Sequence, residues 1–293
     1  MLLSMTGFGA AAGQVDGVEY AVEIRSVNNR YYKSSIKLPE DLAGVEPEVE
    51  RLVRESVSRG SVTVSVRMRL GDEQAAGEIN VVALNKYLDQ LRMVETEANP
   101  TLRIDLASLL LLPGVCNAPA VSDIAERTTD GLLALVKKAI AALMTMRQKE
   151  GQALAKDLHA NCDVIGAQLV IVKRRSPNVV AEYQLRLAAR VQELTRAGQV
   201  EIDQSMLARE VAIFAERSDI NEEISRLTGH VEQFRLAVDG GEPAGRKLDF
   251  IAQEMLREAN TIASKANDGE IARAAVEMKT AIDRIKEQVQ NAE

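Results

Sequence analysis

The fold is decided by residues 154–172, LAKDLHANCDVIGAQLVIV, where an apolar side chain recurs every three or four residues. This spacing places the apolar side chains on one face of an α-helix and is close to a heptad repeat. No proline occurs between about residues 130 and 175, so nothing interrupts the helix. We therefore predict a long amphipathic helix, whose apolar face is formed by Leu154, Leu158, Cys162, Ile165, Leu169 and Val172.

A turn is predicted directly after this helix, at Ser176 and Pro177. Serine can cap a helix, and proline suits the first position of a new one. Apolar residues then return to helical spacing from Val179 to Leu194. The sequence therefore predicts a long antiparallel helical hairpin over residues 126–200.

The regions before and after the hairpin differ in the spacing of their apolar residues. Residues 18–25 and 61–70 alternate apolar and polar side chains, as half-buried strands do, and residues 42–53 between them have helical spacing. After the hairpin, helical spacing continues, with helices expected at about 244–265 and 268–291. We predict a predominantly helical α+β protein with a small N-terminal α/β unit in residues 1–125 and a helical C-terminal domain in 201–293. The narrow apolar seams of the helices are typical of core or coiled-coil packing and suggest self-association.

The composition narrows the class of protein. The chain has 293 residues, of which 46% are hydrophobic and 27% charged, so it can form a core and is not disordered as a whole. Its formal net charge is −7, which is not expected of a protein that coats nucleic acid non-specifically. Any polyanion that it binds must therefore meet a local basic patch.

The cysteines and the apolar runs indicate the compartment. Cys116 and Cys162 lie far apart without CxxC spacing, which makes a disulfide framework or a structural zinc site improbable. No apolar run approaches the ~20 residues that cross a bilayer, and the positively charged start of a secretory signal is missing. We expect a cytoplasmic protein that does not bind membranes.

A candidate polar site lies in residues 245–265, GRKLDFIAQEMLREANTIASK. A turn of 100° per residue places Glu254 and Glu258 together beside the apolar face. Like charges at this spacing destabilise a helix unless a cation lies nearby, and paired carboxylates are also ligands of hard divalent cations. On spacing alone, the explanation that we favour is a solvated face in which Arg257 and Lys247 neutralise the two glutamates.

His230 is a second candidate, on a helix predicted between residues 218 and 239. It shares one flank of this helix with Glu223 and Arg226. Glu223 is seven residues away, or ~10 Å along the axis, so these two side chains cannot bind one ion without help from another helix. Taken alone, His230 is explained as a hydrogen-bonded residue at the edge of the core.

A basic segment lies near the N-terminus, in RSVNNRYYKSSIK at residues 25–37. This segment interleaves basic and aromatic side chains, a mixture that can hold phosphates and stack exposed bases: Arg25, Arg30, Lys33 and Lys37 with Tyr31 and Tyr32. Arg67 and Arg69 lie on the polar side of the later strand. Solvated strand residues explain these side chains as well. The motifs GxGxxG, GxxxxGK[ST], HExxH and GxSxG do not occur in the sequence, so it offers no direct support for the chemistry they carry.

A series of motifs runs in order from one end of the chain to the other: MTGFG (5–9), SVNNRYY (26–32), LPGV (112–115), KEGQAL (149–154), SDINEEISRLTGHVEQF (218–234), GRKLDF (245–250), QEMLREANTIASK (253–265) and KEQVQNAE (286–293). Together they resemble the YicC family of bacterial endoribonucleases. The resemblance implies a YicC-like N-terminal domain, a helical C-terminal domain, RNA cleavage that depends on Mg²⁺ or Mn²⁺, and a ring-like homo-oligomer, expected to be a hexamer.

The resemblance also names candidate site residues. It implies metal binding by Glu223, Asp249, Glu254 and Glu258, and we assign catalysis to His230, Glu254 and Glu258. RNA binding is expected from a larger basic set, to which the same C-terminal motifs contribute three members: Arg25, Arg30, Tyr31, Lys33, Arg67, Arg69, Arg246, Lys247 and Arg257. The predicted function is therefore a metal-dependent endoribonuclease acting on structured or single-stranded RNA. The alternative is a non-catalytic RNA-binding or scaffold oligomer.

Overall fold

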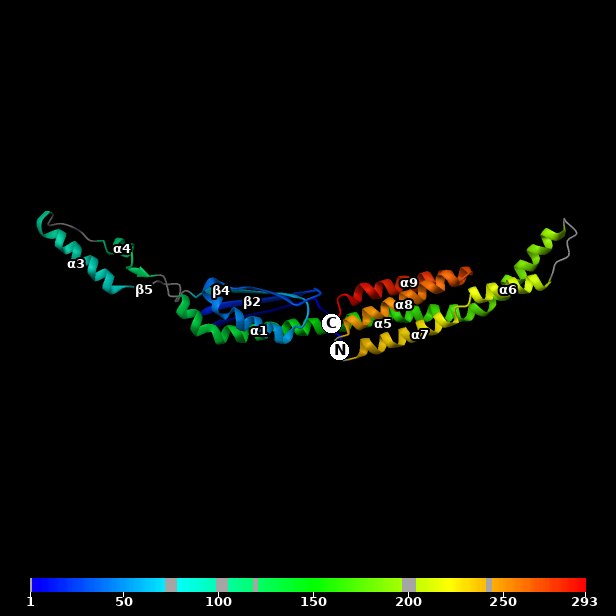
Figure 1. Cartoon of the computed structure of the whole chain (residues 1–293). Helices are drawn as coiled ribbons and strands as arrows, with labels where there is room; N and C mark the ends of the chain where they lie inside the picture. Colours follow the sequence, from blue (N-terminus) through cyan, green and yellow to red (C-terminus); the bar gives the residue numbers. More distant parts are fainter. Residues whose placement is uncertain (1, 72–77, 99–104, 118–120, 197–203, 241–243) are drawn as a thin grey trace. The chain divides into compact units, whose positions relative to one another are not determined.

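The computed structural model of the chain describes residues 2–71, 78–98, 105–117, 121–196, 204–240 and 244–293. These residues form two compact units, one of Phe8–Thr145 and one of Met1–Gly7 with Met146–Glu293. A single helix, α5 (Val121–Arg196), contributes residues to both units (Figure 1). The predicted fold class, a predominantly helical α+β protein with a small N-terminal α/β unit, is confirmed.

A four-stranded sheet organises the first unit. Its strands lie in the order β1-β2-β4-β3, with bounds β1 (Gly7–Val15), β2 (Val18–Val27), β3 (Lys33–Lys37) and β4 (Ser61–Leu70). β2 pairs antiparallel with β4, so that Ala21 lies opposite Arg67, and β3 pairs parallel with β4, so that Lys37 lies opposite Ser65. The two strands predicted from alternating side chains are confirmed.

One face of this sheet is buried beneath helices. It packs against α1 (Glu46–Ser56), which follows the short helix η1 (Glu40–Val45), and against residues 132–144 of α5. Gly9 of β1 permits the close approach of α5, because a Cβ atom there would lie 2.2 Å from the carbonyl oxygen of Ala139. The apolar side chains of β2 and β4 on this face are Val18, Tyr20, Val22, Ile24, Val62, Val64 and Val66.

Between β4 and α5 the first unit contains smaller elements. They are β5 (Glu78–Ile79), α3 (Val81–Ala98), α4 (Leu106–Leu109) and β6 (Cys116–Asn117), and β5 pairs antiparallel with β6. Several large apolar side chains of this region are exposed, among them Val82 at 80%, Met93 at 78% and Leu111 at 86%.

The second unit is helical. The rest of α5 packs with α6 (Gln204–Arg217), α7 (Asn221–Asp239), α8 (Gly245–Lys265) and α9 (Gly269–Val289) around one apolar core. The helices predicted at about 244–265 and 268–291 are confirmed as α8 and α9. The predicted apolar face of α5 is buried in this core, with Leu158, Cys162, Ile165 and Val172 fully enclosed.

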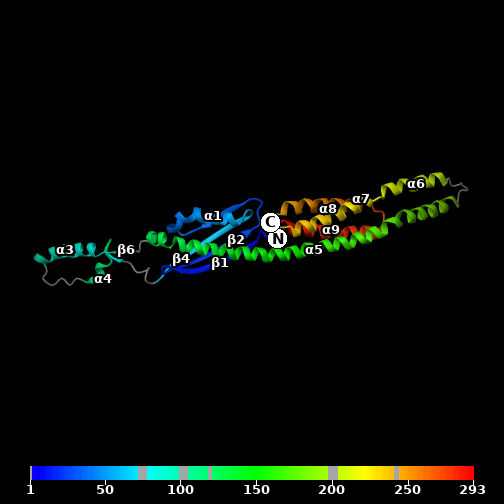
Figure 2. The ribbon, with the colours of Figure 1, turned by 90° about the horizontal axis from the view of Figure 1, so that it is seen from below.

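The predicted turn at Ser176 and Pro177 is wrong, because α5 continues through both residues to Arg196. The chain reverses only after Arg196, so the hairpin is longer than predicted, and its expected end at residue 200 falls outside the described residues. The returning helix is α6, which lies beside the last part of α5 in both ribbon views (Figures 1 and 2), with the rings of Tyr183 and Phe214 stacked at 3.6 Å.

Tertiary contacts on both sides of Pro177 explain why the helix continues. Proline inside a helix costs roughly 3 kcal/mol, because it removes one hydrogen bond and its ring clashes with the preceding turn. Val172 and Val179 are both buried, so both halves of the helix pack into the core. The guanidinium of Arg175 donates to Glu182 at 2.7 Å, across Pro177, and to Asp268 of the α9 N-cap at 2.9 Å. Packing and ion pairs therefore outweigh the local preference for a turn.

Other expectations concern the cysteines, the membrane and the domain boundaries. Cys116 and Cys162 are both free thiols, as predicted. Among the described helices, none has an apolar stretch long enough to cross a membrane. The expected cytoplasmic location and the predicted domain boundaries at residues 125 and 200 stay predictions.

Candidate functional site

Two helices of the second unit form a polar seam along their line of contact. Apolar side chains of α7 and α8, such as Leu227 and Met255, are buried in the core, and this leaves polar side chains at the edge of the interface. We call this edge the α7–α8 seam. It consists of Glu223, Arg226 and His230 from α7 and Glu254, Glu258 and Lys265 from α8. The two helices run antiparallel there, because Glu223 pairs with Lys265 while Arg226 lies near Glu258.

Three of the predicted site residues meet at the centre of the seam. One ligand atom each of His230, Glu254 and Glu258 lies within 4.8 Å of the other two. Glu258 is buried, with a side chain only 5% exposed, whereas His230 and Glu254 are half-buried. From the sequence, His230 needs a second helix to take part in binding an ion, and α8 is that helix. Two carboxylates and one imidazole at this separation are a donor set that a divalent cation can use.

The two carboxylates of this group have only distant contacts with nearby cations. Arg226 Nη1 lies 3.9 Å from Glu258 Oε1, and Arg257 Nη1 lies 3.6 Å from Glu254 Oε2. Both separations exceed those of ordinary hydrogen bonds, so neither carboxylate is tightly paired with its arginine. Lys247 is exposed, and none of the ion pairs found between described residues joins it to either glutamate. The expected neutralisation by Arg257 and Lys247 is therefore at most partial.

Glu223 and Asp249, the other two predicted metal ligands, lie outside the group of three. Lys265 Nζ donates to Glu223 Oε1 at 2.7 Å and to the carbonyl oxygen of Asp219 at 3.1 Å. The hydrogen bond to Glu223 raises the pKa of Lys265. Asp249 accepts a hydrogen bond from Gln253 at 2.9 Å. The second carboxylate oxygen of Glu223 is buried without a hydrogen-bond partner among the described residues.

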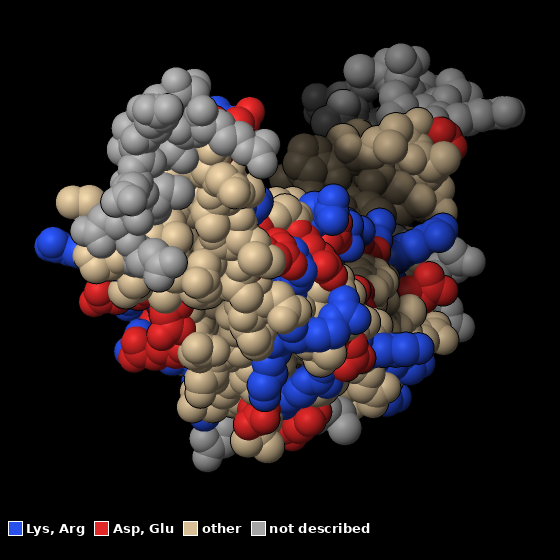
Figure 3. Space-filling model, turned by 90° about the vertical axis from the view of Figure 1, so that its right-hand side faces the viewer, with Lys and Arg blue, Asp and Glu red and all other residues tan. Residues whose placement is uncertain are grey.

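The predicted basic residues of α8 lie on a surface of mixed charge. Arg246, Lys247 and Arg257 are all exposed. Basic and acidic side chains of the described residues are intermingled across the face drawn in Figure 3, rather than separated into patches of one sign. Ion pairs such as Arg226–Glu222 and Arg235–Asp163 likewise join opposite charges in the helical unit.

The predicted N-terminal basic residues lie mainly on the exposed face of the sheet. Arg25, Arg67 and Arg69 occupy alternate positions of β2 and β4, opposite in direction to the buried side chains. Arg67 pairs with Glu23, and the guanidinium of Arg25 lies 5.4 Å from the ring centroid of Phe8. Lys33 begins β3 and is exposed, whereas Arg30 and Tyr31 lie in the connection before it, 5.5 Å apart from guanidinium to ring.

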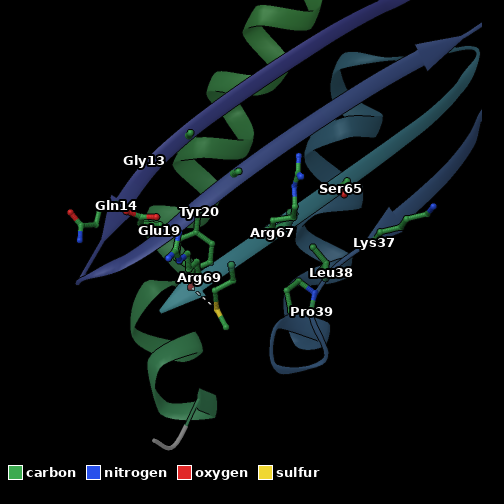
Figure 4. A pocket seen from close by; sticks show the side chains of 14 residues that line it. Gly13, Gln14, Glu19, Tyr20, Lys37, Leu38, Pro39, Ser65, Arg67 and Arg69 are labelled. Carbon is green, nitrogen blue, oxygen red and sulfur yellow. Dashed lines mark hydrogen bonds between the residues drawn. The ribbon is translucent and has the colours of Figure 1, made fainter. Parts of the chain in front are cut away.

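A hollow of about 1110 Å³ opens at one end of this sheet face. Figure 4 shows the residues that line it in front of the sheet, with helices α1 and α5 behind the sheet. Its lining includes the small residues Ala12, Ala21 and Ser65 and the basic residues Lys37, Arg67 and Arg69.

Two residues near these sites are absent from the site residues predicted from the sequence. Arg226 lies four residues before His230, and this spacing alone places it on the same flank of the helix. Lys37 lies four residues after Lys33 and therefore on the same side of β3. Both signals are visible in the sequence. They identify a site residue only when it is known which flank of the helix, or which side of the strand, faces the site.

Comparison with known proteins places the chain in a family. The family described as "Endoribonuclease YicC-like, N-terminal region" matches residues 2–156, and "Endoribonuclease YicC-like, C-terminal" matches residues 172–293. The chain is 33% identical over 300 residues to the "Probable endoribonuclease YicC" of Clostridioides difficile (strain 630) and 32% identical over 295 residues to that of Haemophilus influenzae (strain ATCC 51907 / DSM 11121 / KW20 / Rd). Each match covers 100% of both proteins. The chain belongs to the YicC-like endoribonuclease family.

Proposed function

We propose that this protein is a metal-dependent endoribonuclease and that His230, Glu254 and Glu258 hold the metal ion. The observation that carries the proposal is the meeting of three ligand atoms within 4.8 Å of one another on two packed helices. Membership of the family supports RNA as the substrate. The geometry supports the choice of these residues over Glu223 and Asp249, each of which already has a hydrogen-bond partner of its own.

The residues at the centre of the seam fit a hard divalent cation. Mg²⁺ and Mn²⁺ prefer carboxylate oxygens and accept an occasional imidazole, and the group supplies two carboxylates and one imidazole. Glu258 is buried among apolar residues of α8, which fixes its position. The loose contacts of Glu254 and Glu258 with arginines leave their oxygens available. Glu223, by contrast, is held by Lys265 at 2.7 Å.

The chain's own residues have separable tasks in this proposal. Mg²⁺ or Mn²⁺ would polarise a phosphate and make a bound water or hydroxyl a better nucleophile. Glu254 and Glu258 provide negative charge, and the burial of Glu258 orients it. His230 provides a ring nitrogen at the edge of the group, where it can bind the ion or move a proton. Arg226, with a side chain 54% exposed beside Glu258, can donate to a phosphate oxygen.

RNA contacts outside this centre are part of the proposal. The basic residues of the sheet face, Arg25, Lys33, Arg67 and Arg69, are exposed and suited to phosphate contacts. We assign the same task to Arg30 with Tyr31, and to Arg246, Lys247 and Arg257 of α8. Binding through phosphates releases counterions, so the affinity for RNA should fall as salt rises.

We also propose that the protein acts as a homo-oligomer, in line with the ring-like hexamer that the resemblance implies. A single chain of net charge −7 attracts RNA poorly, whereas several copies can gather their basic sheet residues around one RNA. Exposed apolar side chains on and near α3 and α4, such as Val82 and Leu111, are suited to burial against a second copy. Light scattering tests this, and a fully active monomer would contradict it.

The test of the enzyme proposal is incubation of the purified protein with a structured RNA. We expect internal cleavage in Mg²⁺ or Mn²⁺, none with chelator, and recovery when metal is restored. RNA that stays intact under every metal condition would favour the alternative, a non-catalytic RNA-binding or scaffold oligomer. Glu254→Gln protein, purified in parallel, controls for a contaminating nuclease, because a contaminant would remain active in that sample.

A further inference from the structure

We propose that the exposed sheet face binds a single-stranded segment of RNA, which runs from the hollow at Ala12 and Ala21 to the Phe8–Arg25 contact. The inference rests on the proposed function only in taking RNA as the ligand. It adds the form of RNA that is recognised and the surface that recognises it. Its readout is binding, which is independent of the cleavage site.

The shape of the face suits flat groups. Along β1 and β2 the outward-facing positions between Phe8 and the end of the hollow include Ala10, Ala12 and the half-buried Ala21, which rise little above the backbone. Glu23 also faces outward on β2, and its carboxylate is held by Arg67 and lies 3.9 Å from Arg25. On β4 the neighbouring positions are Thr63 and Ser65. A planar base can therefore approach the sheet closely over this floor. Pro39 and Met68 add apolar surface at the border of the hollow.

The charge of the hollow is opposite to that of the whole chain. Its charged lining residues are Lys37, Arg67 and Arg69, against one acidic residue, Glu19. Arg67 pairs with Glu23, but neither Lys37 nor Arg69 forms an ion pair with a described residue. In a protein of net charge −7 this hollow thus carries more positive than negative side chains, with Glu19 opposite Arg69 across β2 and β4. An excess of positive charge beside this floor fits a ligand that has planar groups joined by phosphates.

A stacking position lies farther along the same face. Phe8 is on the exposed side of β1, four residues or about 13 Å from Ala12, and is 39% exposed. The guanidinium of Arg25 lies 5.4 Å from its ring centroid. Bases of single strands stack on aromatic rings and on guanidinium planes. The floor and the Phe8–Arg25 contact therefore offer positions for more than one base.

Single-stranded RNA fits this face better than a duplex. In a duplex the bases are stacked and paired inside, and proteins reach it mostly through phosphates and the 2′-hydroxyls of its shallow groove. The alanines of this floor offer no donor to these groups, whereas an unstacked base can lie against them. The other occupant to consider is a second copy of this chain, which would cover the same face.

The experiment measures binding of a fluorescent ten-nucleotide single strand by anisotropy, with chelator present so that no cleavage occurs. Ala21→Leu fills the floor and leaves the charge unchanged. Lys37→Gln with Arg69→Gln removes charge and leaves the floor unchanged. Ala43→Leu on η1 and Lys138→Gln on α5 are matched controls, because both residues are exposed away from this face.

We expect Ala21→Leu to weaken binding about tenfold, as removal of one stacked base does. The logarithm of the binding constant falls linearly with the logarithm of the salt concentration. The double variant should reduce the steepness of this slope by about 0.7 for each phosphate that is no longer bound. The controls should bind as the parent does, and a duplex should be insensitive to Ala21→Leu. Circular dichroism verifies that each variant is folded.

Two results would overturn the proposal. One is unchanged single-strand binding by both Ala21→Leu and the double variant while they remain folded. The other is a change of oligomeric mass in Ala21→Leu without a change in RNA affinity, which would assign the face to contact between copies. Neither result bears on cleavage, which is decided by the chelator experiment and not by this face.

Discussion

The α7–α8 seam and the exposed sheet face both carry charged residues, but they hold them in different ways. In the seam, carboxylates lie between two packed helices, and Glu223 and Glu258 are more than nine-tenths buried. On the sheet, Arg25, Arg67 and Arg69 extend from strands into solvent; Arg25 and Arg67 share Glu23 as an ionic partner, and Arg69 forms no ion pair with a described residue. Burial fixes the positions of the first group, whereas the second can adapt to a ligand.

This difference has a functional consequence. Groups held in place before the substrate arrives can stabilise a transition state without reorganising, which affects the rate of the chemical step. Exposed cations mainly attract and position a polyanion, which affects affinity and its dependence on salt. Substitutions in the seam should therefore change the turnover rate or the stability, and substitutions on the sheet face should change binding.

The largest effect is expected from Glu258→Gln. The change keeps the size of the side chain but removes one ligand charge, so we expect cleavage to fall about 100-fold or more and to recover partly at high metal concentration. The measurement is the single-turnover rate on one RNA. RNA affinity and its salt dependence should stay close to those of the parent.

Glu277→Gln on α9 is the matched control for Glu258→Gln, because it makes the same chemical change at an exposed position of the same unit. If the seam were only a solvated face, Glu258→Gln would relieve the repulsion from Glu254. The variant would then be slightly more stable and fully active. That outcome would remove the contrast between the seam and the sheet.

The next effect is on stability, through Lys265→Met. Removing the lysine leaves the Glu223 carboxylate buried without its cation, which costs about 3–5 kcal/mol in fully buried pairs. Lys265 is 37% exposed, so solvent screens part of this and we expect about 2 kcal/mol. Urea unfolding measures it, with exposed Lys156→Met as the control.

Adding Glu223→Gln to Lys265→Met should restore much of this stability, because the uncompensated charge is then gone. The hydrogen bond to Glu223 raises the pKa of Lys265. The contribution of the pair is therefore fully present at neutral pH and is lost only as the pH rises through that raised value. If Lys265→Met is as stable as the parent, this end of the seam is not a tightly held pair.

Local sequence patterns could predict much of the fold, since they depend on a period and on caps. The apolar spacing of α8 gave bounds close to the observed Gly245–Lys265, and the alternation in β2 and β4 gave the central strands. The turn at Ser176 and Pro177 could not be rejected locally. It is overruled by Arg175, whose partner Asp268 lies 93 residues away in the sequence.

The site was predictable to a smaller extent. The spacing of Glu254 and Glu258 placed them together on one helix, but their meeting with His230 depends on the register of α7 against α8. That register follows from the packing of the apolar core and cannot be derived from one helix at a time. The assignment of Glu223 rests on the resemblance alone. Its bond to Lys265 depends on the same register, which brings the first turn of α7 to the end of α8.

A smaller effect should separate the two arginines near the seam's carboxylates. Arg226→Gln should lower kcat about tenfold with little change in KM, because its guanidinium lies beside Glu258 and can reach a phosphate. Arg257→Gln should mainly raise KM, since Arg257 is 71% exposed and is one of the residues to which we assign RNA contacts outside the metal centre. Arg273→Gln on α9 is the control. Equal losses of kcat in both variants would show that Arg226 has no special place in the seam.

The smallest effect concerns the core beneath the seam, which must be closed if the seam is rigid. Cys162 packs in the same core cluster as Leu227 and Met255, and burial raises the pKa of its thiol to about 11. The folded chain therefore keeps the proton at a pH where the unfolded chain releases it. This contribution to stability is present below the ordinary pKa of cysteine and declines as the pH rises towards the raised value. Between about pH 9 and 10 we expect a loss of about 1 kcal/mol that is absent in Cys162→Ala. Urea unfolding of the two proteins at both pH values measures it.

A thiol reagent at about pH 8 should modify the exposed Cys116 and spare Cys162. Rapid modification of Cys162 in the folded protein would mean that the core opens readily, and the seam could then not hold its carboxylates more firmly than the sheet holds its arginines.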